Sequence, residues 1–156
     1  FDAVAATLGL GGYNHFDAQL PMALESLVEP GIDDRYGYDL HLAGDEPFQL
    51  NLNRAIRGIV EDVGCEKPPA AIAAKFHNTL AEALSAAAKA ARDRTGLEVV
   101  ALSGGAFCNR VLTSRLVRRL NQEGFRVLLN HDVPANDGGL ALGQAAIAVD
   151  LLERRT

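Results

Sequence analysis

The sequence predicts an α/β protein, in which helices flank a mixed sheet. Two observations support this fold class. From residue 97 to residue 152, apolar runs alternate with amphipathic stretches in the order strand, helix, strand, helix. Such alternation favours parallel strands that are joined by right-handed crossovers. Residues 1–94 instead show the periodicities of helices and of one β-hairpin.

The first half is expected to contain four helices and the hairpin. A short helix around Val4 and Leu8 ends at Gly9, where glycine is a common stop signal. The other helices are predicted at residues 17–28, 54–63 and 68–94. Alternating apolar residues over 36–42 and 48–52 predict the two strands of the hairpin, with "GDEP" as its turn.

The second half is expected to form two neighbouring parallel strands, "LEVVAL" at 97–102 and "FRVLL" at 125–129. A helix over 105–123 joins them, and a last helix covers 139–152. On the joining helix the spacing puts four apolar residues inward and three arginines outward, namely Leu112, Leu116, Val117 and Leu120 against Arg115, Arg118 and Arg119.

Composition excludes several classes of protein. The 156 residues carry a net charge of −5, which argues against a nucleic-acid surface because such a surface needs a basic field. Two cysteines, Cys65 and Cys108, are too few for a disulfide framework or a zinc site, and a reducing, cytoplasmic setting is the simplest interpretation. No apolar run reaches the roughly 20 residues that a bilayer span needs, so we expect no membrane association.

The stretch Ser103-Gly104-Gly105 lies where the first strand of the second half ends. Ligands of open α/β sheets bind at the carboxyl ends of strands, glycine allows a close backbone approach, and the following helix offers N–H groups to a phosphate. Asn109 adds an amide that can both donate and accept. The alternative is a tight turn whose glycines only permit the geometry.

The stretch "PANDGG" at 134–139 is a joint of the same kind after the second strand. Its Asp137 is a carboxylate that a metal ion or a hydroxyl group could use. The alternative is that Asp137 is only the N-cap of the last helix. Among other candidates, His77 is expected to be a partly buried histidine with its hydrogen bonds satisfied, and Cys108 a structural thiol.

Four stretches together resemble the carboxyl-terminal part of the carbamoyltransferases of nickel–iron hydrogenase maturation: "FDAVAATLGL", "FHNTLAEAL", "LSGGAFCNRVLTSRL" and "VPANDGGLALGQAAIA". That family is similar to the tRNA threonylcarbamoyl transferases and to the O-carbamoyltransferases. The resemblance covers residues 1 to about 151. It implies half of an actin-like, sugar-kinase-like ATPase fold that is built from two RNase-H-like halves.

The resemblance also implies a reaction and its site residues. In the family, carbamoyl-adenylate, made from carbamoyl phosphate and ATP, gives its carbamoyl group to the carboxyl-terminal cysteine of a partner protein, as a precursor of the cyanide ligand. The nucleotide-binding residues of the family fall near the start of this chain, on the stretch 103–109 and on the residue after Asp137. The family's metal-binding aspartate falls on Asp137 itself. The nucleotide-binding set is Asp2, Ser103, Gly104, Gly105, Asn109 and Gly138.

Two departures from the family matter for these expectations. Ala18 stands where the family has a glycine close to the nucleotide, and Cys108 stands where glutamine or histidine is common. Ala18 therefore favours the alternative of a non-catalytic binding or scaffold domain. A third alternative keeps the chemistry but uses a small-molecule hydroxyl as the acceptor.

The chain begins without methionine inside a helical pattern, and we expect residues 1–156 to be a single domain of a longer protein. The family's metal-binding histidines and its adenylate-forming module have no counterpart in this sequence. We therefore expect the isolated chain to be inactive. We also expect exposed apolar surface where the missing amino-terminal half docks, although a second copy of the chain would cover it as well.

Overall fold

The computed structural model describes residues 1–42 and 47–154. Six α-helices, two 3-10 helices and four short strands follow one another in these residues. In chain order they are α1 (Asp2–Thr7), α2 (Gln19–Ser26), β1 (Asp39–His41), β2 (Gln49–Asn51), α3 (Asn53–Gly64), α4 (Pro69–Thr95), β3 (Val99–Leu102), η1 (Gly105–Cys108), α5 (Arg110–Gln122), β4 (Arg126–Leu129), η2 (Asp137–Gly139) and α6 (Leu140–Glu153).

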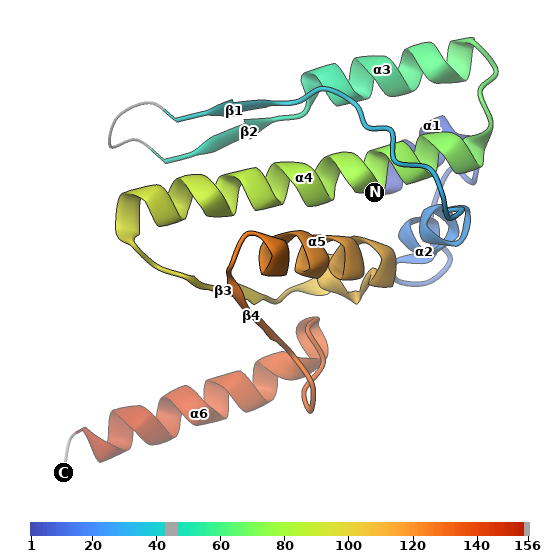
Figure 1. Cartoon of the computed structure of the whole chain (residues 1–156). Coiled ribbons are helices and arrows are strands. Elements are labelled where there is room, and N and C mark those ends of the chain that lie inside the picture. The colour runs from blue at the N-terminus through green and yellow to red at the C-terminus, as the bar shows by residue number, and fades with distance from the viewer. Residues whose placement is uncertain (43–46, 155–156) are drawn as a thin grey trace.

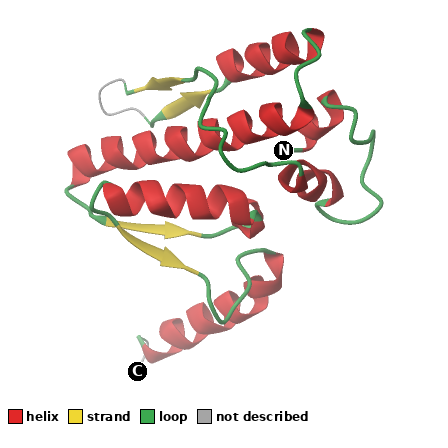
Figure 2. Cartoon of the chain, turned by 45° about the vertical axis from the view of Figure 1, so that its right-hand side comes forward, coloured by secondary structure: helices red, strands yellow, loops and turns green. Residues whose placement is uncertain are grey.

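The long helix α4 is the centre of the molecule (Figures 1 and 2). One side of α4 packs against α1, α2 and α3 through a cluster that includes Leu24, Ile59 and Ile72. Its other side packs against α5 and the β3–β4 sheet through a second cluster that includes Leu112 and Leu116. The helix is therefore apolar on more than one face, and Phe1 and Leu80 contact both clusters.

The strands form two separate two-stranded sheets within the described residues. Strand β3 pairs with β4 in parallel, with Val99 opposite Arg126 and Leu102 opposite Leu129. This confirms the predicted parallel pair and the α/β class. Strands β1 and β2 pair antiparallel, which confirms the hairpin, while its predicted turn at 44–47 lies largely outside the described residues.

The helix predicted over residues 105–123 is confirmed only from Arg110 to Gln122. Residues Gly105–Cys108 form the 3-10 helix η1, Asn109 leaves the helical conformation at φ −69° and ψ 108°, and α5 begins only at Arg110. Asn109 is thus the N-cap of α5 and not a residue of its first turn. The break arises because the Asn109 side chain accepts a hydrogen bond from the Leu112 N–H, as asparagine commonly does at a helix start.

Arg115 does not point outward as the spacing predicted. Its guanidinium donates to the Ala74 carbonyl oxygen at 3.0 Å and to the Asn78 Oδ1 at 2.7 Å, so it lies half-buried between α5 and α4. Guanidinium groups satisfy buried acceptors well because their donors are rigidly arranged. Periodicity alone could not place Arg115, because the acceptors belong to another helix.

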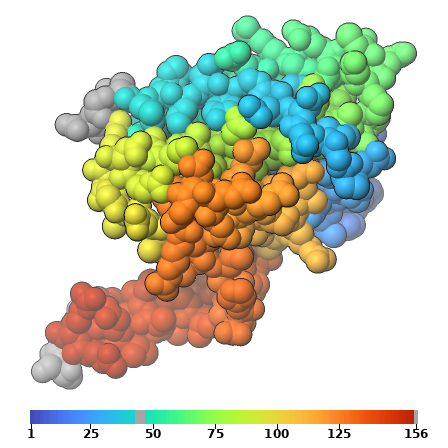
Figure 3. Space-filling model, in the orientation of Figure 1, coloured from blue at the N-terminus to red at the C-terminus, as the bar shows by residue number. Residues whose placement is uncertain are grey.

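Helix α6 extends away from the rest of the molecule (Figures 1 and 3). All its residues are exposed, and its large apolar side chains are between 53% and 65% exposed: Leu140, Leu142, Ile147, Val149, Leu151 and Leu152. Val99 and Leu128 of the neighbouring sheet are also exposed. This apolar surface is the kind that the sequence predicted. Among the described helices, none combines the length and the apolar character that crossing a membrane needs.

Tyr36 anchors the loop before β1 to helices α3 and α4. Its ring is buried, its hydroxyl donates to Asp62 Oδ2 at 2.9 Å, and the Lys75 ammonium lies 4.2 Å from its ring centroid. Lys75 also pairs with Asp62 at 2.7 Å. Gly58 packs against this ring, and a Cβ at Gly58 would lie 2.7 Å from Tyr36 Cδ1.

Replacing Gly58 by alanine is expected to lower the free energy of unfolding by about 1–2 kcal/mol, because overpacking outweighs the gain in helix propensity. The Tyr36 ring cannot move away without breaking its bond to Asp62. Gly64→Ala is the matched control in α3, since nothing lies within 4 Å of its added Cβ. Urea unfolding measures both, and equal stabilities of the two variants would contradict the packing of Tyr36 on Gly58.

Candidate functional site

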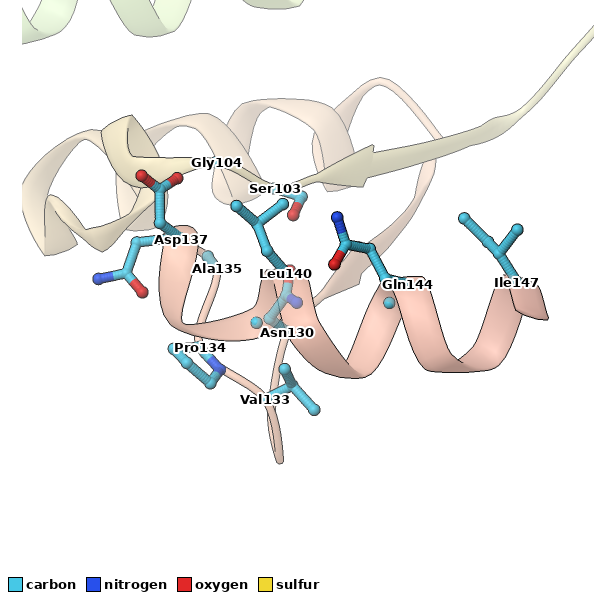
Figure 4. Close-up of a pocket in the computed structure, with 13 residues that line it drawn as sticks. Ser103, Gly104, Asn130, Val133, Pro134, Ala135, Asp137, Leu140, Gln144 and Ile147 are labelled. Atoms are coloured by element: carbon cyan, nitrogen blue, oxygen red, sulfur yellow. The ribbon is translucent and has the colours of Figure 1, made fainter. Parts of the chain in front are cut away.

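Two loops that follow β3 and β4 lie side by side at one edge of the parallel sheet (Figure 4). The first is Ser103–Gly104 and the second is 130–136. The Gly104 N–H donates to the Ala135 carbonyl oxygen at 2.7 Å and ties the loops together. Gly104 has φ 105°, a conformation that side-chain-bearing residues rarely adopt. The two joints that the sequence singled out are therefore neighbours in space.

A cavity of about 390 Å³ lies between these loops and the first turns of α6. Ser103, Gly104 and Asp137 line it, together with polar side chains of the second loop and of α6. Figure 4 shows the Asp137 carboxylate on the side of its loop that faces Gly104. Within the described residues this carboxylate has no hydrogen bond or ion pair, so it is available to a ligand.

Asn136, and not Asp137, caps the helical segment that follows. The Asn136 Oδ1 accepts from the Gly138 N–H at 3.2 Å, while no side-chain cap is formed by Asp137. The interpretation of Asp137 as only an N-cap is therefore wrong. Gly138 packs against Pro134, so the absence of a side chain allows this loop to turn tightly. Gly138 lines neither this cavity nor the larger one described next.

A second cavity of about 740 Å³ opens on the other side of Asn136, which lines both cavities. This volume is in the range of small-molecule sites. Its walls come from α1, α2, the loop before α2, η1 and the start of α5. They include three of the predicted site residues, namely Asp2, Gly105 and Asn109.

Asp2 is held in place by Asn14. The Asn14 Nδ2 donates to Asp2 Oδ1 at 2.8 Å, and the Asn14 Oδ1 accepts from the Leu20 N–H at 2.7 Å. The amide is therefore oriented by the α2 backbone, and one Asp2 oxygen remains to accept a hydrogen bond from a ligand hydroxyl. Asn14 also lines the cavity, and the sequence offered no signal for it because α1 and an irregular loop separate it from Asp2.

The N–H groups at the start of α5 are not free for a phosphate. Glu25 Oε1 accepts from the Arg110 N–H at 2.8 Å and from the Val111 N–H at 3.2 Å, and Asn109 accepts from Leu112. A carboxylate of the chain thus occupies the positive end of the helix dipole. The N–H groups of Gly105 and Ala106 at the start of η1 remain, because the first residues of a helix have no intrahelical acceptor.

His77 is fully buried, as a histidine with its hydrogen bonds satisfied is expected to be. Its Nδ1 lies 2.8 Å from the Ala73 carbonyl oxygen and its Nε2 lies 2.9 Å from the Asn109 Nδ2. Burial lowers the pKa of His77 below its usual value of 6.5, and the Arg115 guanidinium lowers this pKa as well. The imidazole is therefore neutral at physiological pH.

Ala18 and Cys108 both line the larger cavity. Ala18 is the N-cap of α2 and has φ 61° and ψ 18°, a left-handed conformation that glycine adopts freely and alanine adopts at a cost of roughly 1–2 kcal/mol. Its methyl group takes up space at this wall of the cavity. The Cys108 thiol is free and exposed.

No group of three or more histidine, cysteine, aspartate or glutamate residues is arranged to hold a metal ion in the described part of the chain. Asp137 can supply one oxygen ligand, and a complete cation site needs several more.

Comparison with known proteins places the chain in a family. The family described as "Carbamoyltransferase, Kae1-like Domain, second subdomain" matches residues 1–144. The chain is 32% identical to carbamoyltransferase HypF2 of Cupriavidus necator over 96% of its own length and 21% of that protein. It is also 29% identical to a tRNA N6-adenosine threonylcarbamoyltransferase of Synechococcus, over 94% of the chain and 40% of that protein.

A solved structure is similar as well. The crystal structure of full-length HypF in the phosphate- and nucleotide-bound form superimposes with a TM-score of 0.90 and 41% sequence identity. The match covers 98% of this chain and 20% of that one. The chain therefore spans about a fifth of the length of the HypF proteins it matches.

Replacing Glu25 by alanine is expected to lower the free energy of unfolding by about 1 kcal/mol, because two N–H groups of α5 lose their charged acceptor. Glu29→Ala is the control, an exposed carboxylate just beyond α2 whose loss should change stability by less than about 0.5 kcal/mol. Urea unfolding at neutral pH compares them. The capping role is contradicted if both variants keep the stability of the parent.

Proposed function

We propose that this chain, which belongs to the family described as "Carbamoyltransferase, Kae1-like Domain, second subdomain", forms the carboxyl-terminal half of the carbamoyl-transferring module of a longer protein. The module takes carbamoyl-adenylate, made from carbamoyl phosphate and ATP. It passes the carbamoyl group to the carboxyl-terminal cysteine of a partner protein, for synthesis of the cyanide ligand in nickel–iron hydrogenase maturation. The setting is cytoplasmic.

One observation carries this proposal most directly. The hydrogen bond from Gly104 to Ala135 holds the two strand-end loops together, and Asn136 belongs to the walls of both adjoining cavities. A ligand that extends from the larger cavity past Asn136 would reach Asp137. A nucleotide has this extended shape, with its nucleoside in the larger cavity and its phosphate toward the two loops.

In the larger cavity the residues fit a nucleoside. The Asp2 carboxylate accepts from a ribose hydroxyl, the Asn109 amide hydrogen-bonds the nucleoside, and the N–H groups of Gly105 and Ala106 donate toward a phosphate. Ser103 and Gly104 line the cavity nearer Asp137 and border the phosphate. The full-length HypF structure that this chain resembles is phosphate- and nucleotide-bound, which supports this assignment.

In the reaction, the acceptor thiolate attacks the carbamoyl carbon. A new S–C bond forms, the C–O bond to the adenylate phosphate breaks, and AMP leaves with that oxygen. This chain binds and orients the adenylate so that the carbon is presented to the thiolate. Backbone N–H groups at η1 stabilise negative charge on the leaving phosphate, as preorganised donors do.

Asp137 would hold a divalent cation together with ligands from outside the chain, because it is a lone carboxylate at an open cavity. When bound, the cation neutralises phosphate charge. The role of this chain is to hold Asp137 in place through the Asn136 cap and the close packing of Gly139 on Pro134.

The rest of the module covers the apolar surface of α6. A helix that is apolar on all sides is a buried helix in a folded protein, and α6 has no buried residue here. The chain spans about a fifth of its HypF relatives, which leaves ample sequence for a docking half. We accordingly expect the 156-residue chain alone to release no AMP from ATP and carbamoyl phosphate.

The Ala18 methyl group favours a second candidate, a domain that keeps the fold and binds without catalysis. Ala18→Gly discriminates between the two functions in the complete protein. If the domain is catalytic and the Ala18 methyl group only crowds its cavity, this variant binds ATP at least as tightly as the parent and still transfers carbamoyl groups. If it is a scaffold, neither form transfers them.

Asp137→Asn in the complete protein is expected to abolish metal retention, because it removes the charge that a hard cation requires. Stability should hardly change, since Asn136 provides the cap. Metal analysis by mass spectrometry and thermal unfolding measure the two effects.

The matched control is Asn109→Ser, which keeps an N-cap side chain on α5 but removes the amide. This variant should weaken ATP binding roughly tenfold, as expected from unpaired polar groups on the ligand, with metal content unchanged. Full metal content in Asp137→Asn would disprove the metal assignment, and full ATP affinity in Asn109→Ser the nucleotide assignment.

A further inference from the structure

A directed chain of hydrogen bonds links the backbone of α4 to the backbone of α5 through two buried side chains. His77 Nδ1 lies 2.8 Å from the Ala73 carbonyl oxygen, His77 Nε2 lies 2.9 Å from Asn109 Nδ2, and Asn109 Oδ1 lies 2.8 Å from the Leu112 nitrogen. Asn109 is 8% exposed and His77 is 0% exposed. Only Asn109 of the two belongs to the wall of the larger cavity.

The two ends of this chain determine its direction. A carbonyl oxygen can only accept, so the proton of the neutral imidazole lies on Nδ1 and Nε2 is a bare acceptor. A backbone N–H can only donate, so the Leu112 N–H requires the Asn109 oxygen. The reversed amide would place an oxygen lone pair against Nε2 and an N–H against an N–H.

This arrangement fixes what Asn109 can offer to a ligand. The amide has two N–H groups and two lone pairs. His77 takes one N–H and Leu112 takes one lone pair. One N–H and one lone pair of the side chain remain, in an orientation that these two bonds fix, on a residue that lines the cavity.

We propose that His77 is a positioning residue for nucleotide binding, which acts by holding the Asn109 amide in the single orientation that presents its second N–H to an acceptor on the nucleotide. This inference rests on the proposed function, because it requires Asn109 to bind the nucleotide. His77 itself does not touch the ligand. An imidazole suits this role because it bonds the α4 carbonyl and the amide at the same time.

Two substitutions of the same chemical kind separate this role from simple packing. His77→Gln carries its amide oxygen far enough to replace Nε2 as the acceptor for Asn109. His77→Asn is one methylene shorter, so it can replace Nδ1 at Ala73 but cannot reach Asn109. Binding of ATP to the complete protein is measured for both, with and without Asn109→Ser.

We expect His77→Asn to weaken ATP binding on the order of tenfold, the effect of losing one well-oriented hydrogen bond in a buried setting. His77→Gln should stay within about twofold of the parent, since the acceptor is restored. In the Asn109→Ser background His77→Asn should have no further effect, because residues that act through one contact are not additive. Thermal unfolding confirms that each variant is folded.

Parent-like ATP affinity in His77→Asn would overturn the inference, and so would the same loss in both backgrounds. If Asn109→Ser itself leaves ATP binding unchanged, the proposed function fails together with the inference. If Asn109→Ser weakens ATP binding but His77→Asn has no effect, or has the same effect in both backgrounds, the inference alone fails. Should His77→Asn not fold, nitrogen NMR of the parent imidazole still decides, because a proton on Nε2 contradicts the proposed direction of the chain.

Discussion

The parallel pairing of β3 with β4 is the constraint on which the candidate site depends. Parallel strands end at the same sheet edge, so residues that are about thirty positions apart in sequence, Gly104 and Ala135, come within one hydrogen bond of each other. The packing of α5 against α4 supports this pairing from one face through Leu112, Leu116 and Leu120. Without the pairing, Asn109 and Asp137 would belong to unrelated loops.

A second feature of the site is that the chain uses its own polar groups to fix the ligand-facing ones. Glu25 and Asn109 occupy the N–H groups at the start of α5, Asn14 holds Asp2, and His77 holds Asn109. Three of these bonds join residues that are distant in sequence, and the fourth, from the Leu112 N–H to Asn109, is local. The site is therefore shaped before any ligand arrives, which lowers the entropic cost of binding.

The sequence predicted the elements better than the contacts between them. Periodicity placed the helices and both strand pairs, since burial of one face leaves a local pattern. It missed the break at Asn109, because the capping bond to Leu112 competes with helix propensity. It also missed Glu25, Asn14 and Asn136, whose roles arise from tertiary contacts or loop geometry. Two residues brought together as predicted, Asp2 and Asn109, line one cavity, whereas Gly138 turns out to pack against Pro134.

The proposed function requires the loops after β3 and β4 to form one nucleotide site. The most direct test is an ATP titration of the complete protein with 15N-labelled glycine, followed by amide NMR. We expect the resonances of Gly104 and Gly105, which follow β3, and of Gly138 and Gly139, which follow β4, to shift together along one binding curve. Gly58 and Gly64 of α3 should not move. Shifts confined to one loop, or absent from both, would contradict a shared site.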